Sequence, residues 1–217
     1  MNEQRVFISN VKGLKESLER LSEAVEEMKE RQNAYEEERE RMYEIIEEMR
    51  NENDCLEQYG RRETLVINNV PMQDGEDTMQ VALNFIWYHL GIDIHQNFVS
   101  TCHRNFPPKH TYAPHCPPIY IKFVRRDLKR DCMRQKYRLR GTNNGLGQQF
   151  YLSESLTLFR KNLLADVKKH LPHWQFVWTR NGDIWAKRNK NTKPELINTY
   201  SVLDSIIDEE GERINAY

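Results

Sequence analysis

A seven-residue apolar repeat fills the first part of the chain and constrains its fold more than any other feature. Counting from Val11, one core position of the repeat recurs every seventh residue to Asn53, and the second recurs from Leu14 to Leu56. No Pro interrupts this stretch, and no Gly occurs between Gly13 and Gly60. A stripe this narrow needs a partner helix to bury it. We therefore expect a coiled coil over residues 1–59 and a homo-oligomer.

The seam of this coiled coil should hold the apolar residues at the two core positions: Val11, Leu14, Leu18, Leu21, Val25, Met28, Tyr35, Met42, Ile46, Met49 and Leu56. Polar residues at core positions cost stability but fix the register and the number of helices. Asn53 favours a dimer, whereas Gln32 and Arg39 suit the wider core of a trimer. Both oligomers stay open.

Charge divides the chain at the same place. Residues 1–59 hold 9 basic and 17 acidic side chains, against 23 basic and 16 acidic ones in residues 60–217. A chain whose net charge is −1 thus joins an acidic helix to a basic remainder. This asymmetry predicts that the later part binds a polyanion.

Three sequence features bear on the cellular location of the protein. Its four cysteines have no CxxC spacing, its N-terminus is polar, and no run of 18 apolar residues occurs. They predict an intracellular protein, cytoplasmic or nuclear, with free thiols, no secretory signal and no membrane span.

Periodicity predicts an α+β fold after the coiled coil. Residues 60–152 should form an RRM-like β-α-β-β-α-β domain, an antiparallel sheet with two helices on one face. Its elements, in order, are a strand at 64–70, a helix at 78–90, strands at 98–104 and 119–124, a helix at 126–139 and a strand at 149–152. The proline-rich residues 105–118 should form a loop.

Residues 153–217 should form a small helix–hairpin domain. Ser153 is the expected N-cap of a helix that reaches residue 169. Asn181-Gly182 lies between two strand-like runs, 175–179 and 184–187, which is typical of a tight β-hairpin. A last helix is expected at 201–207.

The strand at 119–124 is the first candidate for nucleic-acid binding. In an RNA-recognition motif, alternate residues of this strand face outward and stack on bases. Tyr120 and Lys122 occupy such positions, but Pro118 and Val66 stand where further aromatic residues are usual. We therefore expect binding through charge more than through stacking on this sheet. A protein-binding version of the same sheet is the alternative.

A basic helix supplies that charge, with eight Lys or Arg in residues 125–140. Its outward face should hold Arg126, Lys129, Arg130 and Arg134, because they share one side of the helix. Such phosphate contacts give affinity with little sequence preference. The expected binding residues are Arg104, Tyr120, Lys122, Arg125, Arg126, Lys129, Arg130, Arg134, Arg160 and Arg180.

Neither a metal site nor a catalytic site is predicted. Cys102-His103 and His115-Cys116 flank one loop, but their spacing matches no common zinc site, so thiols and surface histidines are the preferred interpretation. No phosphate-binding glycine loop, nucleophile elbow or zinc-protease motif occurs. We expect no cofactor and no enzymatic activity.

Four segments following the heptads carry a family resemblance: 65–71, 100–104, 118–126 and 176–188. With them the chain resembles the first-open-reading-frame proteins of LINE-type retrotransposons and, equally, the FP (few polyhedra) proteins of baculoviruses. The first resemblance implies a trimeric coiled coil and a nucleic-acid chaperone that uses Arg104, Arg125, Arg126 and Arg160. The second implies a role in virion occlusion and envelope-protein traffic through viral or host protein partners. Thr101 replaces the acidic residue that usually precedes the His-Arg pair, which leaves the partner of Arg104 open.

The favoured function from sequence is therefore an oligomer that binds single-stranded nucleic acid, RNA before DNA, with chaperone-like tolerance of sequence. The alternative is an FP-like viral protein acting through protein partners. We expect no enzymatic function, because no catalytic motif occurs.

Overall fold

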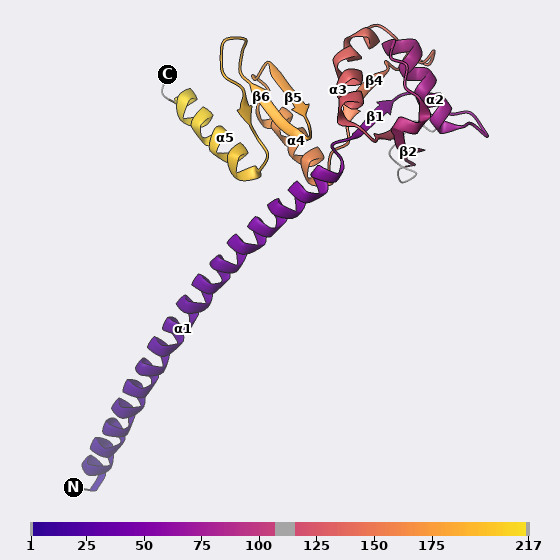
Figure 1. The fold of residues 1–217 in the computed structure, drawn as a ribbon. Helices are drawn as coiled ribbons and strands as arrows, with labels where there is room; N and C mark the ends of the chain where they lie inside the picture. Colours follow the sequence, from indigo (N-terminus) through magenta and orange to yellow (C-terminus); the bar gives the residue numbers. More distant parts are fainter. Residues whose placement is uncertain (1, 107–115, 216–217) are drawn as a thin grey trace. The chain divides into compact units, whose positions relative to one another are not determined.

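The computed structural model describes the backbone of residues 2–106 and 116–215, and the side chains of residues 12–106 and 116–210 (Figure 1). The chain divides into two compact units, Met1–Glu52 and Asn53–Tyr217. The first is helical and the second combines helices with two antiparallel sheets, so the fold is α+β. Domain boundaries at 59/60 and 152/153 stay predictions.

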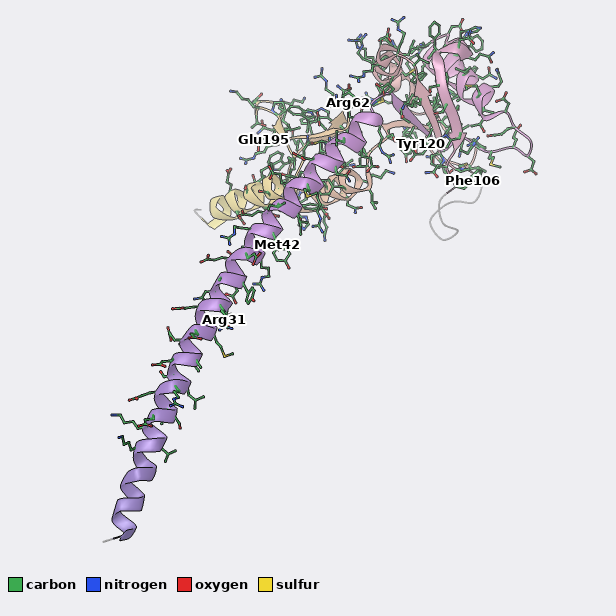
Figure 2. The ribbon with its side chains drawn as sticks, turned by 60° about the horizontal axis from the view of Figure 1, so that its bottom comes forward. Arg31, Met42, Arg62, Phe106, Tyr120 and Glu195 are labelled. Carbon is green, nitrogen blue, oxygen red and sulfur yellow. The ribbon has the colours of Figure 1, made fainter. Side chains whose placement is uncertain are left out.

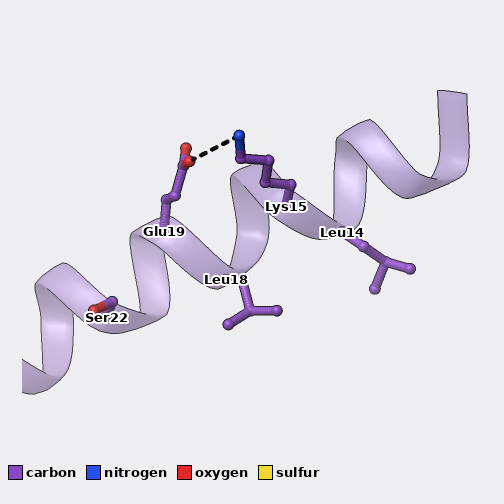
Figure 3. A pocket seen from close by; sticks show the side chains of 5 residues that line it. All are labelled: Leu14, Lys15, Leu18, Glu19 and Ser22. Carbon is purple, nitrogen blue, oxygen red and sulfur yellow. Dashed lines mark ion pairs between the residues drawn. The ribbon is translucent and has the colours of Figure 1, made fainter. Parts of the chain in front are cut away.

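Helix α1 spans Asn2–Gly60, in agreement with the helix predicted from the heptads. Figure 3 shows Leu14 and Leu18 on one side of it, while Lys15 and Glu19 form an ion pair of 4.0 Å on another. The predicted seam residues with described side chains are all exposed, from 39% at Ile46 to 74% at Leu56, and Met42 projects from the helix in Figure 2. The side chain of Val11 lies outside the described residues. Pairing of this stripe with another chain stays a prediction.

The first sheet of the second unit has the strand order β2-β3-β1-β4, with all neighbours antiparallel. Its strands are β1 (Thr64–Asn68), β2 (Val99–Arg104), β3 (Ile119–Phe123) and β4 (Tyr151–Glu154), and its helices are α2 (Thr78–Phe85) and α3 (Arg126–Gln135). Leu65, Ile121 and Phe123 pack with Phe85 and Cys132 in one hydrophobic core. Alternate strand residues point to opposite faces, so the helices cover one face and leave the other open. The order of elements is the predicted one.

Two predicted helices depart from α-helical geometry in their last turns. The helix predicted at 78–90 changes to π geometry at η1 (Ile86–Leu90) before Gly91, whose φ of 70° ends it. The last four residues of the helix predicted at 126–139 form a 3₁₀ turn, η3 (Lys136–Leu139). A further 3₁₀ turn, η2 (Gln96–Phe98), occupies the expected start of the second strand. Most of the predicted loop at 105–118 lies outside the described residues.

The prediction of Ser153 as a helix N-cap was wrong. Strand β4 continues to Glu154 because Ser153 and Glu154 pair with Val66 and Leu65 of β1. Thr157 instead caps α4 (Leu158–His170), its hydroxyl accepting the backbone N–H of Arg160 at 3.1 Å.

The second sheet has the order β5-β6-β7, with strands β5 (Phe176–Arg180), β6 (Asp183–Lys187) and β7 (Glu195–Leu196). Asn181 and Gly182 have φ values of 57° and 89°, which confirms the predicted tight hairpin. Ile184 and Ala186 pack against α4 and α5 (Tyr200–Asn215) in a second hydrophobic cluster. Helix α5 is longer than the predicted 201–207. Among the described helices, none has an apolar run sufficient to cross a bilayer.

Candidate functional site

A basic groove of about 530 Å³ lies between α3 and the β5–β6 hairpin. Seven basic side chains line it and come from three separate segments: Arg62, Arg126, Lys129, Arg130, Arg134, Lys136 and Arg180. Met133 and Trp178 add an apolar part to the lining. The fold thus gathers basic residues that lie more than 100 positions apart in the sequence.

Carboxylates offset only some of this charge. Arg126 pairs with Glu63 at 2.7 Å, and Asp131 lies 3.7 Å from both Arg130 and Arg134. Burial alone would raise the pKa of Glu63, but the hydrogen bond from Arg126 and its charge lower it. Within the described residues, Arg62, Lys136 and Arg180 have no carboxylate within ion-pair distance. The groove therefore keeps a net positive charge, and phosphate is the ligand chemistry that suits it.

Glu154 fixes the hairpin against α3 at the base of this groove. Its two carboxylate oxygens accept the backbone N–H groups of Asn181 and Gly182 at 3.0 and 2.9 Å, and Lys129 donates to one of them at 2.9 Å. Burial pushes the pKa of Glu154 up, but the charge of Lys129 and the turn N–H groups outweigh it and lower the pKa. The predicted outward position of Lys129 was wrong, since its side chain is 5% exposed and committed to Glu154.

Arg160 holds the other side of the same turn. The guanidinium donates to the carbonyl of Gly182 and to Asp183, both at 2.9 Å, and to Asp54 at 2.7 Å. Asp54 also accepts the hydroxyl of Thr157. Arg160 is thus buried and paired within the chain, so it is not part of the exposed surface on which the sequence placed it.

Arg104 is likewise an internal residue. It forms a two-pronged ion pair with Glu76 at 2.7 and 3.0 Å and donates to the carbonyls of Val70, Pro71 and Pro117. The hydrogen bonds from Arg104 lower the pKa of Glu76 despite its burial. Glu76 is therefore the acidic partner of Arg104, which the sequence left open because Thr101 stands where an acidic residue is usual. This arginine ties the loop after β1 to the ends of β2 and β3.

The open face of the first sheet carries the remaining predicted residues. Tyr120 stacks on His103, with ring centroids 5.9 Å apart and planes inclined by 14°, and Lys122 follows on the same face. A shallow cavity of about 320 Å³ covers this area and also contacts Arg61 and Thr101. Figure 2 shows the place of Tyr120 on the sheet. This face and the groove are two separate sets of residues.

Of the ten predicted binding residues, the groove brings together Arg126, Arg130, Arg134 and Arg180, with Lys129 at its base. Arg125 is exposed beside them and pairs with Asp127, whose pKa its hydrogen bond lowers. The ten predicted binding residues did not include Arg62, Lys136 or Trp178, although Lys136 belongs to the basic run 125–140. A signal for Trp178 existed, because the Asn-Gly turn places it opposite Trp185.

The described residues include no cluster of three His, Cys, Asp or Glu able to hold a metal ion. Cys102 and Cys116 are free thiols, and burial raises the pKa of Cys102 to about 12. His110 and His115 lie outside the described residues. The prediction that the Cys102-His103 and His115-Cys116 pairs hold no metal therefore stays a prediction.

Residues 157–207 match a family model described as Baculovirus FP protein domain 2. The matched segment holds α4, the three strands of the second sheet and the first half of α5. A search of curated proteins finds no match to the chain. The similarity to baculovirus FP proteins is therefore supported over this segment, and the resemblance to retrotransposon proteins gains no support.

Proposed function

We propose that the chain is a viral protein of the baculovirus FP type that acts by binding and not by catalysis. The match of residues 157–207 to the FP domain carries this proposal. The side chains of this segment form the second hydrophobic cluster, so the match covers a folded part of the chain and not a stretch of low complexity. On the FP resemblance, the protein contributes to occlusion-body formation and envelope-protein traffic through protein partners.

Complementation tests this role. The chain is expressed in insect cells infected with a baculovirus whose own FP gene is inactivated, and occlusion bodies are counted per cell. Wild type should restore the count, whereas Leu163→Asp, which places a charge in the second cluster, should not. Lys168→Ala on the exposed side of α4 serves as the matched control. A well-expressed wild-type chain that restores nothing contradicts the proposal.

A second function, binding of single-stranded nucleic acid, is favoured by the basic groove. Seven Lys or Arg line it. Lys129 is paired with Glu154, and three of the other six have no acidic partner among the described residues. Phosphate contacts from such residues give sequence-tolerant, salt-sensitive binding, as expected of an RNA-favouring chaperone. The β-α-β-β-α-β order and Tyr120 on the open face support an RRM-like domain.

A salt titration of the full chain tests this second function. A fluorescent 20-nucleotide single-stranded RNA should bind at low salt, with log affinity falling against log salt by a slope of about −4 if six cations each neutralise one phosphate. Arg130→Ala/Arg134→Ala should flatten that slope. Lys168→Ala/Lys169→Ala removes the same charge from exposed positions of α4 outside the groove and should leave the slope unchanged. Absence of binding at low salt, or equal losses in both double variants, is the contrary result.

A further inference from the structure

The β5-β6-β7 sheet has two faces of opposite character. Ile184, Ala186 and Ile197 point inward and are fully buried in the second cluster. The register pairs Trp178 with Trp185, Trp185 with Leu196, and Phe176 with Lys187. Residues paired in this way share a face of the sheet, and alternation places them on the face opposite Ile184.

This second face is rich in aromatic side chains that folding does not bury. Phe176 and Leu196 are exposed, by 39% and 44%, and Trp178 and Trp185 are partly exposed. A group of large apolar side chains exposed together on a protein surface commonly marks a binding site. We call the face formed by Phe176, Trp178, Trp185 and Leu196 the aromatic platform.

The charges around the aromatic platform favour a polyanion as its occupant. Arg180 and Lys187 stand on the same strands, and Trp178 and Arg180 also line the basic groove. The platform and the groove are therefore continuous. Aromatic rings beside a basic groove are the combination that proteins use for single strands, where bases stack on rings and cations hold the backbone.

We propose that the aromatic platform stacks the unpaired bases of a single-stranded nucleic acid whose phosphates occupy the groove. This inference rests on the second proposed function and adds the source of its preference for single strands. A duplex keeps its base faces stacked, so only a single strand offers them to Trp178 and Trp185. The platform supplies stacking surface that the first sheet lacks, where Val66 and Pro118 replace aromatic residues.

The experiment compares two probes on the full chain: a 20-nucleotide single-stranded RNA and an oligonucleotide of the same length and charge that has abasic sites throughout. Each stacked base should strengthen binding roughly 5- to 150-fold. Wild type should therefore prefer the probe that has bases. Trp178→Ala should lose most of that preference while keeping its affinity for the abasic probe, and Trp178→Phe should retain it.

Trp87→Ala is the matched control, because Trp87 is exposed on η1 and does not line the groove. It should behave as wild type. If wild type binds both probes equally well, the platform is wrong while groove binding stands. If neither probe binds at low salt, both proposals fall. The platform is also wrong if Trp178→Ala weakens both probes equally, or if it releases a co-purifying protein and leaves both affinities unchanged.

Discussion

Single arginines in this protein divide into two groups that the sequence does not distinguish. Arg104 and Arg160 are buried, with every guanidinium engaged by carboxylates or backbone carbonyls. Arg130 and Arg180 carry the same charge at exposed positions beside the groove. A buried arginine is tolerated only when partners satisfy it, and those partners lie 28 and 106 residues away in sequence. Residue type alone therefore does not identify a ligand contact.

The Arg104–Glu76 pair makes stability depend on pH. The hydrogen bond from Arg104 holds the pKa of Glu76 below its usual 4.5, so its contribution is complete above that value and lost as pH falls through the lowered pKa of the folded state. We expect Glu76→Gln to reduce the free energy of unfolding by about 3 kcal/mol at pH 7, because the buried Arg104 loses its counter-charge. The deficit relative to wild type should shrink in acid.

Urea unfolding between pH 7 and pH 3 measures this deficit. Asp127→Asn is the control, because Asp127 pairs with the exposed Arg125 and surface pairs contribute little. A deficit for Glu76→Gln that stays constant across this range would show that the pKa shift does not govern it.

At the scale of elements, the β5–β6 turn is the junction on which the groove depends. Its N–H groups bind Glu154, its carbonyl at Gly182 binds Arg160, and both partners are buried. The turn thereby fixes where Trp178 and Arg180 stand relative to α3. A small change at this turn has consequences for the whole groove.

Gly182→Ala tests how closely the turn is packed. The new Cβ would clash with the side chain of Gln58. Gln58 has little freedom to move away, because it donates to the carbonyl of Ser155 and accepts the N–H of Thr157. A positive φ costs alanine about 1 kcal/mol, and the clash adds roughly 1–3 kcal/mol. Gly147→Ala is the matched control, with a φ of 79° and open space around it. Thermal unfolding should rank Gly182→Ala well below Gly147→Ala, and equal melting temperatures would contradict the packing argument.

Local sequence patterns predicted most helices and strands. The predictions failed where a residue distant in sequence determines the conformation or burial of a side chain. The strands around Asn181-Gly182 followed from the turn residues, because a two-residue hairpin imposes its own register. Ser153 looked like a helix cap, yet its pairing with Val66 of β1 extends the strand. Lys129 fitted an outward helical face, but Glu154 draws it inward. Asp54 and Gln58 lie off the heptad seam, and nothing local marks them as buried.

The whole molecule combines a long helix bearing an uncovered apolar stripe with a body bearing a basic groove. A stripe with Leu21 and Met28 more than 60% exposed is costly for a lone chain in water. The predicted self-association would remove that cost, and it would place several grooves on one assembly. Linked sites raise overall affinity by factors of about 10² to 10⁴ without any new contact. The modest groove of one chain would then suffice for tight binding.

Breaking the seam should therefore weaken binding without touching the groove. Leu21→Glu/Met28→Glu puts two charges at core positions, and we expect light scattering to report a monomer where wild type is a multimer. Its affinity for single-stranded RNA should fall at least about 10-fold, while the groove residues are unchanged. Asn33→Glu/Ala34→Glu adds the same charge at positions outside the seam and should preserve both the assembly and the affinity. A seam variant that remains multimeric would show that the heptads do not hold the chains together, and a monomer with full affinity would show that one groove is enough.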